Sequence, residues 1–171
     1  MSLSLYDASI PVYLHMLRNL AALLDKAEAH AKGNGTALSE LTEARLAPDM
    51  HSLIGQVQLA SDAAKGGAAR LSGQTPPSMP DTETSLDDLK ARIAKTIAFV
   101  ETITPEQVNG NEDRIIELPT PSRTLTFTAK DFVLKFSLPN FFFHVTTAYG
   151  LLRHKGAPIG KLDFLAGATS V

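Results

Sequence analysis

Apolar residues recur every three or four positions in four long stretches of the chain, and this spacing is typical of amphipathic helices. The first stretch covers about residues 5–32, with Pro11 near its start, and it ends at Gly33 and Gly35. Glycine is common just after the last turn of a helix, so the pattern predicts a first long helix that ends there.

The second stretch opens in LAPDMHSL, at residues 46–53. Pro48 suits the first turn of a helix, and Asp49 complements the positive end of the helix dipole, so we place the helix start at these residues. Further along, the run AAKGGAARL at 63–71 is poor in bulk. A neighbouring helix backbone could therefore approach closely at this point, at some cost in helix propensity.

The third stretch, residues 85–100, begins with Ser85 and Asp88 at the spacing of a capping box. About 13 residues with three prolines and no periodicity precede it. An extended chain of that length reaches about 43 Å, whereas a 23-residue helix is about 35 Å long. The connection can therefore run back along the bundle and leave the second and third helices parallel.

The fourth stretch begins at Thr128 and ends near His154. Before it, TPEQ at 104–107 predicts a short helical turn. RIIELPTPSRTLTFT alternates on both sides of a Pro-Ser turn, which predicts a hairpin that pairs 114–118 with 124–128. We therefore expect one all-α domain over residues 1–171: a four-helix bundle with a small β-hairpin between the third and fourth helices.

The fourth helix carries apolar residues on two opposite faces. The main face is centred on Val145 and contains Leu134, Leu138, Phe141, Val145, Ala148, Tyr149 and Leu152. Phe132, Phe136 and Phe143 lie on the reverse side, and both faces must be buried. Either the hairpin and the C-terminal tail cover the reverse face, or two copies of the chain meet there in a homodimer. Both alternatives stay open, and a homodimer through this helix is the partner we expect.

Composition narrows the class of protein further. Among 171 residues, 16 are basic and 18 are acidic, so the chain lacks the positive charge that nucleic acid or an anionic membrane would require. The absence of cysteine excludes disulfides, thiolate metal sites and cysteine nucleophiles. No stretch has the character of a signal peptide or a membrane-spanning helix, and we expect a cytoplasmic protein.

The histidines are the main candidates for chemistry. His15 and His30 fall on the polar side of the first helix, and His154 suits the negative end of the fourth. His144 lies between the two apolar faces of the fourth helix, and Asn140 is one turn before it. A zinc-type pair would need a second ligand three or four residues away, and none of the usual ligand types is there.

The segments ARLAPDM, DTET, LTFT and PNFFFHVTTAYGLLRHKGAPIGKLDFL, in this order and at this spacing, resemble a bacterial family of unknown function, the domain of unknown function numbered nineteen-ninety-three. The resemblance covers nearly the whole chain. That family is grouped with the DinB-like, YfiT-related superfamily, whose fold is a four-helix bundle of up-down-down-up topology. The resemblance therefore implies the same crossover that the length of the third connection allows.

Members of the superfamily often hold a divalent metal with three histidines, one early in the second helix and two spaced by four in the fourth. Some are thiol-dependent transferases. On this resemblance His51 matches the first ligand position and His144 matches the first of the pair, but Ala148 stands at the third position. Asp49 or Tyr149 would have to complete such a metal site.

Two functional hypotheses follow. The first is a small-molecule-binding or interaction module without a complete three-histidine metal site, in which the fourth helix offers His144, Tyr149 and Asn140 as polar contacts and no cofactor is needed. The alternative is a metal-dependent transferase or hydrolase that uses His51 and His144 with zinc or nickel. The sequence does not decide whether the protein is an enzyme.

Overall fold

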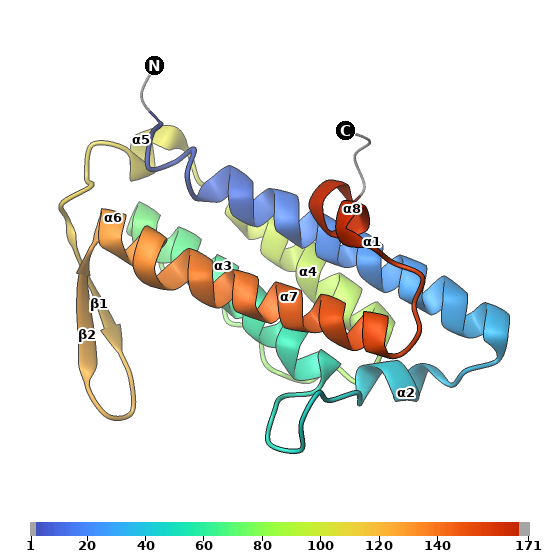
Figure 1. Cartoon of the computed structure of the whole chain (residues 1–171). Helices are drawn as coiled ribbons and strands as arrows, with labels where there is room; N and C mark the ends of the chain where they lie inside the picture. Colours follow the sequence, from blue (N-terminus) through green and yellow to red (C-terminus); the bar gives the residue numbers. More distant parts are fainter. Residues whose placement is uncertain (1–2, 168–171) are drawn as a thin grey trace.

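The helices predicted from the apolar spacing are present in the computed structural model, which describes residues 3–167 (Figure 1). In chain order the elements are α1 (Ile10–Asn34), α2 (Leu38–Thr42), α3 (Leu53–Ser72), α4 (Leu86–Val100), α5 (Pro105–Val108), β1 (Ile115–Pro119), β2 (Thr124–Thr128), α6 (Ala129–Asp131), the π-helical segment η1 (Phe132–Ser137), α7 (Leu138–His154) and α8 (Lys161–Ala166). None of the helices in this described part is long and apolar enough to cross a membrane.

The four long helices α1, α3, α4 and α7 form the bundle. In Figure 1, α3 and α4 run in the same direction, and α1 and α7 run in the opposite one. The connection between α3 and α4 therefore returns along the length of the bundle, as its length predicted. Ser85 and Asp88 form the predicted capping box at the start of α4, with each side chain accepting a backbone N–H of the other residue. The up-down-down-up topology is confirmed.

The predicted start of the second long helix was wrong. Helix α3 begins at Leu53, and the Ser52 side chain caps it by accepting a hydrogen bond from the N–H of Gly55. Pro48 and Asp49 lie in a preceding turn that is closed by a bond from Met50 N to Ala47 O. The extended backbone of Ser52 ends this loop, so the helix cannot begin earlier. His51 therefore lies just before the helix.

The fourth predicted helix is continuous from Ala129 to His154, with Thr128 as its N-cap, but contains the six-residue segment η1. Pro139 follows this segment, and in a regular α-helix its ring would clash with the carbonyl four residues earlier. The wider π turn relieves that clash and rotates the preceding residues. As a result Phe132 and Val133 are buried, whereas Leu134, predicted on the main face, is 53% exposed.

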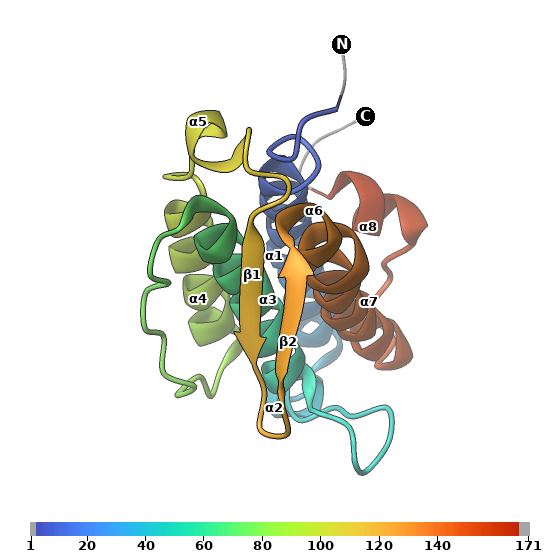
Figure 2. The ribbon, with the colours of Figure 1, turned by 90° about the vertical axis from the view of Figure 1, so that its left-hand side faces the viewer.

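The hairpin covers part of the reverse face of this helix. Strands β1 and β2 pair antiparallel, with Ile115 opposite Thr128, so the first strand begins one residue later than predicted. Figure 2 shows the two strands beside α3 and α6. The ring of Phe127 lies 6.1 Å from Phe132 and 5.7 Å from Phe136. Phe143 is outside this cluster and remains 57% exposed.

The C-terminal segment packs elsewhere on the bundle. Asn19 of α1 donates hydrogen bonds to the carbonyls of Phe164 and Leu165 in α8. The ring of Phe164 also meets Tyr149 of α7 edge-on, with ring centres 5.7 Å apart. Helix α8 therefore lies across α1 and α7, whereas the hairpin packs on the Phe132 end of the reverse face.

Candidate functional site

His144 and His51 are joined through a residue of α3 that the sequence reading did not single out. The side-chain nitrogen of Gln56 donates to the carbonyl of His51, at 3.3 Å. The Gln56 oxygen therefore faces His144, whose Nδ1 lies 2.8 Å away. Because an amide oxygen only accepts, Nδ1 carries the proton, and Nε2 of the neutral ring is left as an acceptor.

Burial is the main cause that lowers the pKa of His144 below its ordinary value, and the nearby His51 lowers it further. His51 itself is exposed, with its ring packed over Gly55. Gln56 therefore links the two histidines at the start of α3. Burial favours the neutral form of His144.

The other three histidines lie elsewhere. His15 is exposed beside α8, His30 is half-buried beside Asn34, and His154 is exposed at the end of α7.

This cluster does not fit the three-histidine metal centre that the resemblance implies. Ala148 occupies the position one turn after His144 and is fully buried in the core. In residues 3–167 no three histidines, cysteines, aspartates or glutamates come together as a metal-binding group. The convergent donors are two imidazoles and one amide, and the amide oxygen is already used by His144.

The other two predicted contact residues are separated by the structure. Asn140 lies one turn before His144 on the same side of α7, and it lines a cavity. Tyr149 faces α8 instead, where its ring meets Phe164 and borders a shallow apolar pocket with Thr146 and Lys161. The structure therefore groups Asn140 with His144 and places Tyr149 on another face.

The cavity beside Asn140 has a volume of about 220 Å³ and lies between α3, η1 and β1. We call it the α3–η1 pocket. Its apolar walls are formed by Leu59, Leu118, Phe132 and Phe136. The rings of Phe132 and Phe136 are stacked, with centres 6.0 Å apart.

Polar groups from three elements also reach the α3–η1 pocket. Asp62 and Arg70 come from α3, Ser137 comes from the end of η1, and Asn140 comes from α7. The amide of Asn140 has no hydrogen-bond partner among the described residues. The pocket therefore combines apolar walls with a few convergent polar groups, which is typical of ligand sites.

A buried hydrogen bond holds the inner side of this pocket. Tyr13 Oη and Ser137 Oγ are 2.6 Å apart, and both residues are buried. Gly67 makes room for the pair, because a Cβ at Gly67 would lie 2.6 Å from each oxygen. Burial raises the pKa of Tyr13 to about 12, so its hydroxyl stays protonated.

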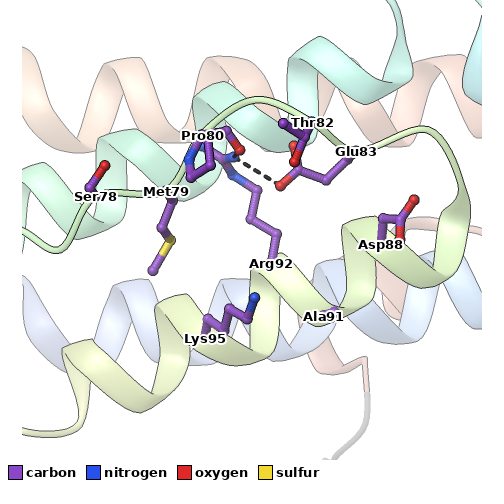
Figure 3. A pocket seen from close by; sticks show the side chains of 9 residues that line it. All are labelled: Ser78, Met79, Pro80, Thr82, Glu83, Asp88, Ala91, Arg92 and Lys95. Atoms are coloured by element: carbon purple, nitrogen blue, oxygen red, sulfur yellow. Dashed lines mark hydrogen bonds and ion pairs between the residues drawn. The ribbon is translucent and has the colours of Figure 1, made fainter.

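A second cavity of about 220 Å³ lies where the crossover passes over α4 (Figure 3). Arg92 reaches from α4 to this segment, and its side chain is 1% exposed. Its guanidinium nitrogens lie 2.9 Å from Asp62, 3.0 Å from Asp81 and 3.0 Å from Glu83. Because Asp81 and Glu83 lie on the crossover and Asp62 lies on α3, these ion pairs fasten the crossover to α3 and α4.

The residues that sequence reasoning missed are Gln56, Gly67 and Arg70, all on α3. A signal existed for Gly67, because the run AAKGGAARL indicated a close approach. What approaches there is the Tyr13 and Ser137 side-chain pair. Gln56 and Arg70 carry no local signal, since their partners come from distant parts of the chain.

Comparison with known proteins agrees with this architecture. A crystal structure described as a DinB family member protein from Shewanella denitrificans is 41% identical to the chain, with a TM-score of 0.88. The match covers 98% of this chain and 94% of that chain. No curated protein matches the chain.

The topology and this similarity define the chain as a DinB-like helical-bundle protein. Within this class, the model of the Domain of unknown function family DUF1993 matches residues 5–165. The chain belongs to that family.

Proposed function

We propose that this protein binds a small organic molecule in the α3–η1 pocket and that binding does not depend on a metal. The observation that carries the proposal is the free amide of Asn140 beside stacked aromatic walls, in a cavity of about 220 Å³. These groups are held by helices and a hairpin, so the cavity is largely preformed.

The local backbone supports the same proposal. Segment η1 forms one wall, and π turns inside α-helices occur frequently at functional sites. Gly67 leaves space on the opposite helix for the buried Tyr13 and Ser137 pair. His144 lies one turn beyond Asn140, so its neutral imidazole borders the same side of the α3 and α7 pair.

A fragment screen tests this function. Purified wild-type protein would be screened by ligand-observed NMR and thermal shift with small acids, amines, amides and alcohols. Ala63→Phe fills the pocket from its half-buried edge, and Ala94→Phe is the matched control on the exposed side of α4. We expect fragments that stabilise the wild type and Ala94→Phe, but not Ala63→Phe. A screen without hits, or hits that survive Ala63→Phe, would refute the proposal.

A metal-dependent transferase or hydrolase acting through His51 and His144 is the second candidate, and the link between the two residues through Gln56 favours it. The missing third ligand at Ala148 weighs against it. Zinc and nickel titrations followed by thermal shift separate the two candidates, because a functional metal should stabilise the protein strongly. Stoichiometric metal that is lost in His51→Ala and His144→Ala would favour this second function.

A further inference from the structure

Resting on the proposed function, we infer that the ligand of the α3–η1 pocket is a small anion, a carboxylate attached to an apolar ring or short chain. Arg70 would bind the carboxylate, and the stacked phenylalanines would contact the apolar part.

Charge is the first argument. Arg70 is half-buried and lines the pocket, and within residues 3–167 its guanidinium forms no ion pair. It donates one hydrogen bond, from Nη1 to the carbonyl of Gly66 at 3.0 Å. The remaining donors keep the fork geometry that matches a carboxylate.

The acidic residue of the pocket does not cancel this charge. Asp62 lies 2.9 Å from Lys65, which forms no other ion pair within the part of the chain that the structure describes, so this ammonium group offsets the Asp62 carboxylate. Arg92 lies 2.9 Å away on the other side, shared with Asp81 and Glu83. An incoming anion would therefore meet an uncompensated guanidinium and a compensated carboxylate.

The position of Arg70 is not explained by stabilisation of the C-terminal end of α3. A cation in the last turn of α3 would favour the negative end of the helix dipole. Arg114 already occupies that end of α3. Its Nη2 donates to the carbonyls of Arg70 and Leu71, the latter at 2.6 Å. The Arg70 guanidinium lies back along α3 toward Gly66 instead.

Shape is the second argument. Phe132 and Phe136 are stacked at 6.0 Å with their planes 21° apart, and Leu118 of the hairpin lines the same cavity. Cavities of about 150 Å³ already accept a benzene ring. At about 220 Å³, the α3–η1 pocket has room for such a ring and one carboxylate.

Benzoate, benzamide and benzylamine are matched probes, because they keep the ring and change the charge. Kd would be measured by NMR titration on the wild type, Arg70→Met and Arg18→Met, an exposed arginine on α1. We expect benzoate to bind at least tenfold more tightly than benzamide, and benzylamine to bind more weakly than both. Arg70→Met should remove the preference for benzoate and leave benzamide unchanged, while Arg18→Met should behave as the wild type.

A second variant keeps the charge. A Cβ at Gly66 would lie 2.7 Å from Arg70 Nη1, so Gly66→Ala should displace the guanidinium and weaken benzoate binding while the protein stays folded. This variant replaces Arg70→Met if the latter does not fold.

The outcomes separate the two proposals. Equal Kd values for benzoate and benzamide, or pocket binding restricted to neutral or cationic fragments, would overturn the anion inference and leave the proposed function standing. The absence of any fragment sensitive to Ala63→Phe would overturn both.

Discussion

Gly67 and Gly33 both lie inside helices, but the structure gives them opposite roles. A Cβ at Gly67 would clash with two buried hydroxyls, whereas nothing lies within 4 Å of a Cβ at Gly33. We expect Gly67→Ala to lower the free energy of unfolding by about 1–3 kcal/mol through overpacking. Gly33→Ala should raise it by up to about 1 kcal/mol, because alanine favours the helix. Urea denaturation of both variants measures this difference, and equal effects would contradict the assigned role of Gly67.

His144 gives a prediction about pH. Its pKa in the folded protein is lowered below the ordinary 6.5, so the unfolded chain binds its proton more readily. The contribution of His144 to stability is therefore complete above pH 6.5 and is lost as the pH falls below that value. An NMR titration should place the His144 midpoint below 6.5, and His144→Gln should lose less stability than the wild type between pH 7 and 5. A midpoint at or above 6.5 would contradict the neutral state assigned to the half-buried ring.

For single residues, the sequence predicted only their positions on the face of their own helix. The position of His144 between two faces, and of Asn140 one turn earlier, followed from helical spacing. Gln56 could not be found in this way, because its pairing with His144 depends on how far α3 is displaced along α7. The exposed position of Leu134 was missed because a π turn changes the count of residues.

Among the elements, the crossover between α3 and α4 depends most on a single side chain. Arg92→Leu would leave Glu83, whose side chain is 11% exposed, without its ion pair. Removing one partner of a buried pair costs about 3–5 kcal/mol, whereas an exposed pair contributes about 1 kcal/mol or less. We therefore expect Arg92→Leu to destabilise the protein strongly and to expose residues 73–85 to proteases.

Arg18→Leu is the matched control, because Arg18 pairs with Glu101 at a site where both side chains are about half exposed. Urea denaturation and limited proteolysis would compare the two variants. Similar losses in both would show that the Arg92 cluster does not fasten the crossover.

The type and order of the main elements were predictable from the sequence. Capping residues marked the start of α4 and of the last long helix, and alternation marked the hairpin. The start of α3 was not predictable, because Pro48 and Asp49 suit a turn as well as a helix start. The extended conformation of Ser52 decides between these alternatives.

At the scale of the whole molecule, part of the reverse face of the fourth predicted helix stays exposed, and this part could form a contact between two copies of the chain. The hairpin packs against Phe132 and Phe136, so a homodimer through α7 would have to use Phe143, which is 57% exposed. We propose that two copies meet there. Phe143→Asp should then sediment as a folded monomer, and its melting temperature should no longer depend on protein concentration.

Leu162→Asp is the control for this experiment, since Leu162 is also exposed, at 74%, but lies on α8 and not on α7. It should leave the dimer intact. A wild-type protein that sediments as a monomer, or a dimer that persists in Phe143→Asp, would contradict this interface.

The topology was predictable because a connection of about 13 residues can span the bundle. The α3–η1 pocket was not predictable, because it forms only where residues of α3, η1, α7 and β1 meet. Those contacts join positions up to about 80 residues apart, and no local pattern encodes them.

The π turn in η1 also bears on how relatives should be compared. A π turn has one residue more than the α turn it replaces, so it corresponds to a single insertion in the ancestry of the helix. A homologue that lacks one residue between Phe132 and Leu138, and has no proline at position 139, would form a regular α-helix there and turn the phenylalanines away from the hairpin. A one-residue gap at this point of an alignment would therefore separate family members that keep the pocket from those that have lost it.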